Sequence, residues 1–133
     1  MTRDLYDPLM GNARRLLVLR LAFWAALVFA FVMAVLPQPP ELPGAPSDKV
    51  QHIAAFLVLS LLGSLAHFQT RPLILGAGLS LFGALIEIVQ GIPSLHRDSD
   101  PLDWVADTAA VVVVLVLIHW LRARRNGSVG ERI

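Results

Sequence analysis

Four long apolar segments restrict the fold of this chain more than any other feature of its sequence. They cover residues 16–36, 48–68, 72–92 and 103–121. Each is about 20 residues long, the length that an α-helix needs to cross the hydrocarbon core of a bilayer. Because 56% of the 133 residues are hydrophobic and only 16% are charged, a soluble domain of this size could not bury the apolar surface. The sequence therefore predicts an all-α, four-helix transmembrane bundle.

The breaks between these segments indicate how the chain is organised. Residues 37–46, PQPPELPGAP, hold too much proline for a helix and predict an extended connection. Ser47 is then expected to cap the second helix, with Asp48 in its first turn. Three parts result, namely an N-terminal cytoplasmic segment, a membrane domain and a basic cytoplasmic tail expected to be mobile, over residues 1–15, 16–121 and 122–133.

The distribution of basic residues predicts the orientation in the membrane. With four spans, both termini lie on one side, and that side receives every Lys and Arg except Lys49 and Arg97. The positive-inside rule then places both termini in the cytoplasm of a multi-pass plasma (inner) membrane protein. A cleaved signal peptide is the alternative for the first segment, since Arg14 and Arg15 resemble a charged n-region. The apolar run is longer than a usual signal sequence, and no A-x-A-like site follows it.

Two acidic residues lie within the apolar segments, Glu87 in the third and Asp107 in the fourth. A charged side chain near the bilayer centre costs about 2.5–3.5 kcal/mol on insertion scales. Gly76, Ser80 and Ala84 recur every four residues, which is typical of a helix face that another helix approaches closely. Glu87 continues this face one turn further on, so we expect it to point into the protein.

Other polar residues are expected at the same depth. At a rise of 1.5 Å per residue, His52 lies roughly 5 Å, Asp107 roughly 6 Å and Glu87 roughly 7 Å inside the outer ends of their helices. Three helices and a loop thus supply one polar layer on the extracytoplasmic face. The predicted binding residues in this layer are Asp48, Lys49, His52, Glu87, Gln90, Arg97, Asp103 and Asp107.

The residue types in this layer suit several kinds of chemistry. Arg97, with Lys49, could hold the phosphate or carboxylate of a ligand. Glu87 and His52 are the candidate general bases. No short ligand motif such as H-E-x-x-H is present and there is no cysteine, so we expect no cofactor. A divalent metal is left open only as a weak alternative, with His52, Glu87, Asp103 and Asp107 as its ligands.

The same residues also have purely structural explanations. Asp48 and Asp103 are acidic residues at helix starts, where the helix dipole stabilises a negative charge. Lys49 could serve as an interfacial anchor. Glu87 and Asp107 could form a polar contact that only holds helices together, in the way that intramembrane polar groups often do.

The order and spacing of these residues resemble the VanZ-like family. The motifs are D-K-x-x-H at Asp48, Lys49 and His52; E-x-x-Q at Glu87 and Gln90; an arginine at Arg97; and D-x-x-A-[N/D] at Asp103, Ala106 and Asp107. The match spans about residues 48–114. It departs from the family in having Asp107 where Asn is frequent, and Ala110 or Val111 where glycine is common. The resemblance implies a small envelope protein connected, in some members, with low-level resistance to teicoplanin.

Three functions are compatible with these observations. The leading hypothesis is an outward-facing polar pocket that binds an anionic or glycopeptide-related ligand, such as a cell-wall precursor. The alternatives are a membrane hydrolase or transferase acting on a lipid-linked cell-wall intermediate, and a structural membrane partner. The bilayer is the expected environment, and a homo-oligomer or another membrane partner is left open. We expect no nucleic-acid binding, because the basic residues lie at segment ends, where lipid head groups explain them.

Overall fold

The described residues form four helices and one short helical turn. The computed structural model describes residues 7–37, 44 and 46–130. In chain order the elements are α1 (Asp7–Val35), α2 (Asp48–Ala66), α3 (Pro72–Gln90), the 3-10 turn η1 (Pro93–Leu95) and α4 (Pro101–Gly130). These described ranges contain no strand, so the predicted all-α class is confirmed.

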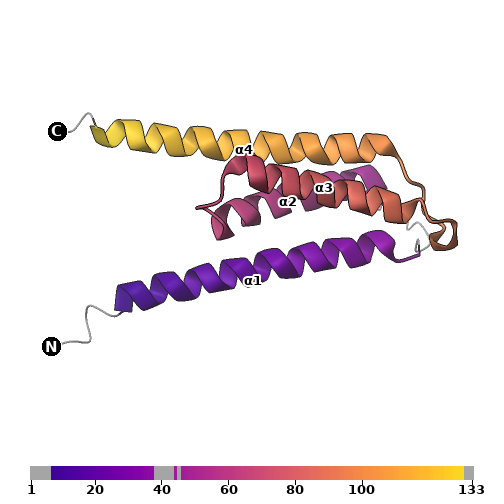
Figure 1. The fold of residues 1–133 in the computed structure, drawn as a ribbon, viewed down its shortest axis with the longest axis horizontal. Helices are drawn as coiled ribbons and strands as arrows, with labels where there is room; N and C mark the ends of the chain where they lie inside the picture. The colour runs from indigo at the N-terminus through magenta and orange to yellow at the C-terminus, as the bar shows by residue number, and fades with distance from the viewer. Residues whose placement is uncertain (1–6, 38–43, 45, 131–133) are drawn as a thin grey trace.

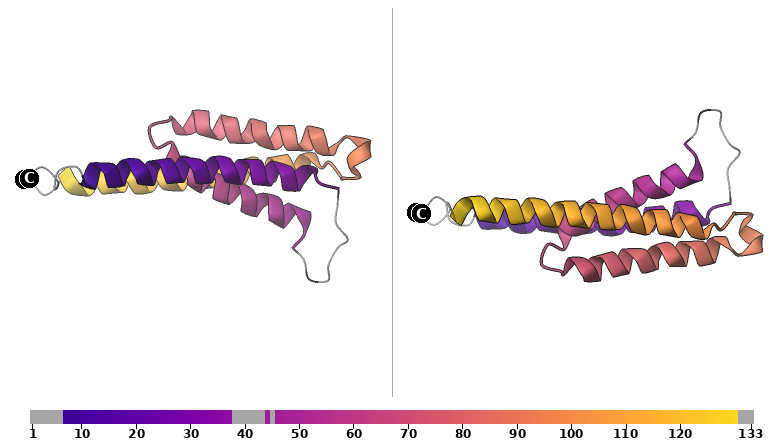
Figure 2. Two further views of the ribbon diagram at one scale, coloured as in Figure 1. Left: turned by 90° about the horizontal axis from the view of Figure 1, so that it is seen from below. Right: turned by 90° about the horizontal axis from the view of Figure 1, so that it is seen from above.

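The helices run side by side, and the start of α1 lies at the same end as the end of α4 (Figure 1). α1 lies along one side of the bundle and α4 along the other, with α2 and α3 between them. We call the opposite end, where α1 and α3 finish and α2 and α4 begin, the distal end. The first turns of α2 diverge from the other helices towards this end (Figure 2).

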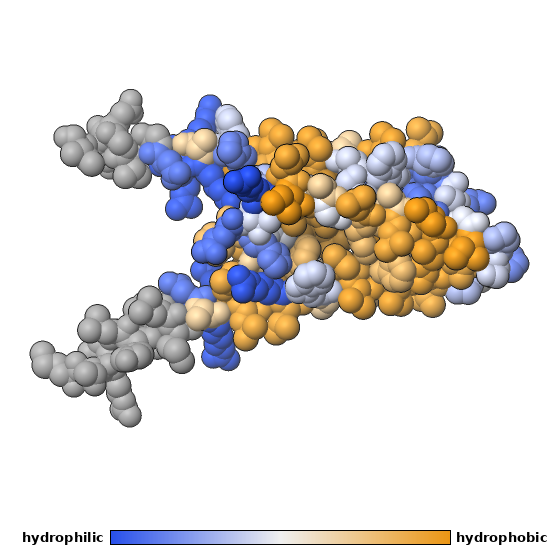
Figure 3. Space-filling view, viewed as in Figure 1, coloured by the Kyte–Doolittle hydropathy of each residue, from blue (hydrophilic) through white to orange (hydrophobic). Residues whose placement is uncertain are grey.

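All four helices have the length and apolar composition of membrane spans, namely Gly11–Val35, Asp48–Ala66, Pro72–Gln90 and Pro101–Asn126. Large apolar side chains point outward from them; Leu73, for example, is 83% exposed, and Leu81 and Ile88 are each 71% exposed. The space-filling view shows an apolar zone over the middle of the visible face, with polar groups towards both ends (Figure 3). This surface fits a lipid environment, because in water it would strongly favour association.

Small residues on α3 let α4 approach, as the four-residue spacing predicts. A Cβ atom added at Gly76 would lie 3.0 Å from Leu115 Cδ1. The Ser80 and Thr108 hydroxyls are hydrogen-bonded at 2.9 Å between Oγ and Oγ1, and the Trp104 indole N–H donates to the Ser80 carbonyl at 3.0 Å. Glu87, which continues this face, is buried.

Two helices are longer than the sequence predicts. α1 begins at Asp7, well before the first apolar segment, and α4 continues to Gly130. The fourth helix therefore continues beyond residue 121, where its apolar segment ends, while residues 131–133 of the tail lie outside the described residues. The first four residues of the α4 extension, 122–125, are the strong helix formers Arg and Ala, and residues 122–130 contain no proline. The extension is also held in place, since Arg122 donates to the Ser64 carbonyl at 2.9 Å and the Arg124 guanidinium lies 3.8 Å from the centre of the Trp120 ring.

Gly63 of α2 lies where α1 and α3 meet, and this contact allows a test of the packing. A Cβ at Gly63 would be 3.1 Å from both Phe23 Cε2 and Leu75 Cδ1, whereas a Cβ at Gly78 would meet nothing within 4 Å. We expect Gly63→Leu to lower the free energy of unfolding by about 1–3 kcal/mol through overpacking. Gly78→Leu, the matched control, should raise it by up to about 1 kcal/mol through helix propensity. Unfolding of both variants in mild detergent measures the difference, and equal losses would contradict this packing.

Candidate functional site

The start of α2 places three of the predicted site residues. Ser47 caps the helix, as predicted, with the Val50 N–H donating to its Oγ at 3.4 Å. Asp48 and Lys49 therefore lie in the first turn, and His52 lies one turn deeper. The first two side chains reach the distal surface, while His52 is buried.

The connection from α3 to α4 brings Arg97 to the ends of α1 and α2. After η1 the chain turns at His96, whose φ of 49° is left-handed. Arg97 Nε then donates to the Leu36 carbonyl at 2.9 Å, and its NH2 donates to the Met33 carbonyl at 2.6 Å. These are carbonyls at the C-terminal end of α1, which have no partner within the helix. The remaining nitrogen, NH1, lies 3.6 Å from Asp48 Oδ1.

Three further pairs of titratable side chains join α2 to the beginning of α4 and to the residue before it. Lys49 Nζ lies 3.1 Å from Asp103 Oδ1 and 3.6 Å from Asp100 Oδ2, at a partly exposed position. His52 Nδ1 lies 3.1 Å from Asp107 Oδ2, and the two side chains are only 8% and 1% exposed. The residues of one predicted motif, on α2, thus contact the residues of another, on α4. α2 and α4 are held together at two successive turns.

Glu87 and Gln90 complete the layer from the end of α3. The Ser99 hydroxyl lies 2.9 Å from the Glu87 carbonyl and 3.2 Å from its Oε2. Gln90 Nε2 donates to the Ala34 carbonyl of α1 at 3.1 Å. Glu87 Oε1 and Asp107 Oδ1 are buried, and neither has a hydrogen-bond partner among the described residues. The end of α3 is therefore held against Ser99 of the loop and Ala34 of α1, while one oxygen of each of these two carboxylates makes no hydrogen bond to the described residues.

All eight predicted residues lie at the distal end, but they form separate pairs rather than one cluster. Lys49 contacts the acids of α4, whereas Arg97 faces α1 and α2, so the two cations do not converge on one ligand position. The proposed metal ligands are not assembled either. Within the described part of the chain, no group of three or more His, Asp or Glu side chains is arranged to hold a metal ion.

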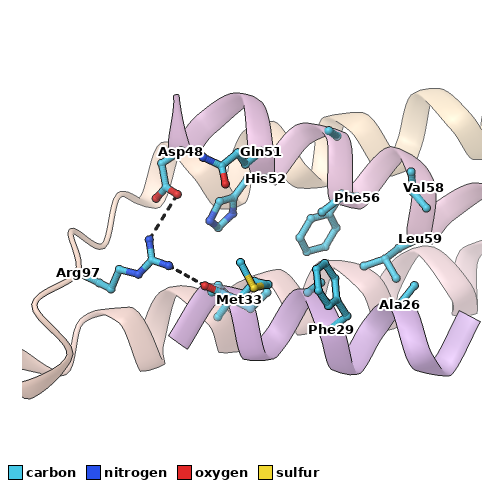
Figure 4. A pocket seen from close by; sticks show the side chains of 15 residues that line it. Ala26, Phe29, Met33, Asp48, Gln51, His52, Phe56, Val58, Leu59 and Arg97 are labelled. Carbon is cyan, nitrogen blue, oxygen red and sulfur yellow. Dashed lines mark hydrogen bonds and ion pairs between the residues drawn. The ribbon is translucent and has the colours of Figure 1, made fainter. Parts of the chain in front are cut away.

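A groove of about 480 Å³ runs between α1 and α2 from the distal end towards the middle of the bundle (Figure 4). Its mouth carries Asp48, Gln51, His52 and Arg97. Met33 lies next to this mouth, and the deeper part is apolar, lined by residues that include Ala26, Phe29, Phe56, Val58 and Leu59. The groove therefore has a polar end and an apolar end, and three of the eight predicted residues line it.

The sequence contains one pattern that indicates this groove, although the lining residues are mostly apolar and do not stand out within a membrane span. Ala26, Ala30 and Ala34 recur every four residues on α1 and line one wall. This spacing is the same as that of the small residues on α3, but here the small side chains border an open space instead of a helix contact.

The sequence also contained a signal for Asp100 as the cap of α4, because an Asp before a proline is typical of a helix start. Its Oδ1 accepts the Leu102 N–H at 2.9 Å.

Fold and site together define a multi-pass helical membrane protein with a polar layer at one end and an adjoining lateral groove. In comparisons with known proteins, no family model, curated protein or solved structure matches this chain.

Proposed function

We propose that this chain is a VanZ-like protein of the plasma membrane that binds a cell-envelope ligand with an anionic group. The observation that carries the proposal is the groove, whose polar mouth contains Arg97 and whose volume of about 480 Å³ is typical of ligand pockets. The distribution of Lys and Arg supports an orientation in which both termini are cytoplasmic and the groove opens on the extracytoplasmic side.

Arg97 is the group best suited to hold the ligand's anion. A guanidinium has five N–H donors in a planar fork that matches carboxylate and phosphate. Two contacts to α1 carbonyls set its orientation, and its NH1 points towards Asp48 across the mouth (Figure 4). Glu87, Gln90 and Asp107 do not line the groove, so their part is to position the helix ends around it.

The contacts between motifs support the VanZ-like assignment. Lys49 pairs with Asp103 and His52 pairs with Asp107, so D-K-x-x-H on α2 and D-x-x-A-D on α4 form one unit. A charged residue at this depth is costly without its partner. This cost gives a physical reason for the two motifs to occur together, because each supplies the partner of the other's charged residues.

Susceptibility to teicoplanin tests the function in cells that depend on this protein. Arg97→Lys keeps the charge but loses the planar fork, and Glu87→Gln removes a buried charge. Both variants are expected to bring susceptibility to the level of a strain without the protein, at unchanged protein abundance. Arg71→Lys, at the other end of the bundle, and Asp98→Asn, at an exposed loop position, are the matched controls. Full activity of the Arg97 and Glu87 variants would refute the proposed site.

An enzyme acting on a lipid-linked cell-wall intermediate is the second candidate, and the His52–Asp107 pair favours it. Asp107 holds the Nδ1 side of the ring, and His52 lines the groove. Nε2 would then be the general base that takes a proton from an attacking water. Release of a labelled head group from a lipid-linked precursor by the purified protein, and its loss in His52→Gln, would favour this function over binding alone.

A structural role for the polar layer makes a different prediction. The structure pairs Glu87 with Ser99 and, among the described residues, with no cation, so exchange of charges is better tested at Lys49 and Asp103. The double variant Lys49→Asp with Asp103→Lys should preserve both stability and susceptibility phenotype if these residues only hold α2 against α4.

A further inference from the structure

We propose that the groove between α1 and α2 binds an anionic phospholipid of the surrounding leaflet, and that Asp48 competes with the lipid phosphate for Arg97. The inference rests on the proposed function in one respect, because both require the groove to accept a ligand. It goes further in naming the ligand class and the route of entry.

The polarity of the groove matches a lipid in its normal orientation. Asp48, Gln51 and Arg97 lie at the distal end, and Phe29 and Leu59 lie deeper along the helices (Figure 4). A phospholipid in the leaflet at the distal end would have its head group at the helix ends and its acyl chains towards the bilayer centre. It would therefore enter the groove without turning over.

The groove is also open to the hydrocarbon region. Phe29 of α1 and Val58 of α2 line it, and they remain 65% and 52% exposed. Ala30 and Ala34 of α1, together with Ala55 of α2, leave the space between the walls unfilled because none of them carries a large side chain. An acyl chain could move sideways from the bilayer between the two helices, with no passage through water.

The charges at the mouth restrict the head group to one with an anionic group that can compete with Asp48 for Arg97. Arg97 is the one Lys or Arg among the lining residues, and Asp48 is the one carboxylate. The contact between them, at 3.6 Å, is longer than the two hydrogen bonds of Arg97 to α1, at 2.9 and 2.6 Å. A phosphate can thus replace Asp48 at NH1 while the guanidinium stays attached to α1. Asp48, partly exposed, would turn towards water.

The experiment uses the full chain in phosphatidylcholine vesicles that contain a minor fraction of phosphatidylglycerol with a photoreactive acyl chain. Crosslinked residues are mapped by mass spectrometry, and labelling is expected at Phe29, Met33 and Val58. Arg97→Gln should reduce it about tenfold, the effect of losing one charge-assisted hydrogen bond. Asp48→Asn should increase it by a similar factor, because it removes the competing carboxylate. The same photoreactive chain on phosphatidylcholine should label the groove less strongly.

Two variants of α1 test the groove independently of Arg97. Ala30→Phe places a ring in the groove and should abolish labelling at Val58. Ala25→Phe adds the same ring at an exposed position of α1 that does not line the groove, and labelling should persist.

Three results would overturn the proposal. Equal reductions of groove labelling in Arg97→Gln and Asp48→Asn would indicate a purely structural ion pair. Uniform labelling of all lipid-facing residues, or unchanged labelling in Ala30→Phe, would show that the groove is not the binding site. The lipid inference and the proposed function can fail separately. Absent labelling with an intact teicoplanin phenotype refutes the lipid site alone. Groove labelling with normal susceptibility in Arg97→Lys supports the lipid site and refutes the proposed function.

Discussion

Replacing His52 with alanine is expected to lower the free energy of unfolding by about 3 kcal/mol, the cost of leaving a buried charge without its partner. Asp107 is 1% exposed, and its Oδ2 is paired with His52 Nδ1 at 3.1 Å. Its other oxygen, Oδ1, already has no partner among the described residues. The loss should exceed the roughly 0.6 kcal/mol that is average for hydrogen bonds between membrane helices, because a carboxylate is isolated.

A double variant separates the pair from the packing around it. His52→Leu with Asp107→Ala removes both polar groups and nearly keeps their combined volume, so its stability should be close to that of the unmodified chain. His96→Ala, at an exposed position of the loop, is the control for loss of an imidazole. The measurement is reversible unfolding in mild detergent. If the double variant is as unstable as the single one, the contact energy lies in packing and not in the charge pair.

Replacing Glu87 with methionine is expected to raise the free energy of unfolding by about 2 kcal/mol, within the range found when buried ionic groups are exchanged for apolar ones. Methionine is unbranched and of similar length, and Oε1 of Glu87 has no partner in the described part of the chain. The Ser99 hydroxyl keeps an acceptor, because it can donate to the backbone carbonyl of residue 87 at 2.9 Å. No new unpaired group is created.

This gain in stability should accompany a loss of function, as is common for residues that natural proteins retain at a cost. The same unfolding measurement, with the teicoplanin assay in parallel, checks both expectations. A Glu87→Met protein that is less stable than the unmodified chain would show that Glu87 holds α3 in place. Glu87 would then stabilise the bundle itself, as the structural interpretation of the sequence holds, and would not be a residue retained for function at a cost in stability.

The resemblance to the VanZ-like family and the assignment of the eight polar residues to binding stay predictions. What the structure adds is their contacts. Lys49 and Arg97 were both expected to hold an anion, but only Arg97 lines the groove, because the side chain of Lys49 is directed to Asp103. Spacing along a helix gives the face of a residue, but not which of two neighbouring helices that face will meet.

The sequence by itself determined the number of helices, the inward position of Glu87 and the cap at Ser47. These follow from segment length, helical periodicity and local hydrogen bonding, which act over a few turns of one helix. Only the tertiary structure decided that α2 diverges from α1 and leaves a groove, and that Arg97 bonds to carbonyls of α1. These features depend on contacts between residues about 60 positions apart, such as Arg97 with Leu36, and no local pattern encodes which distant partners will meet.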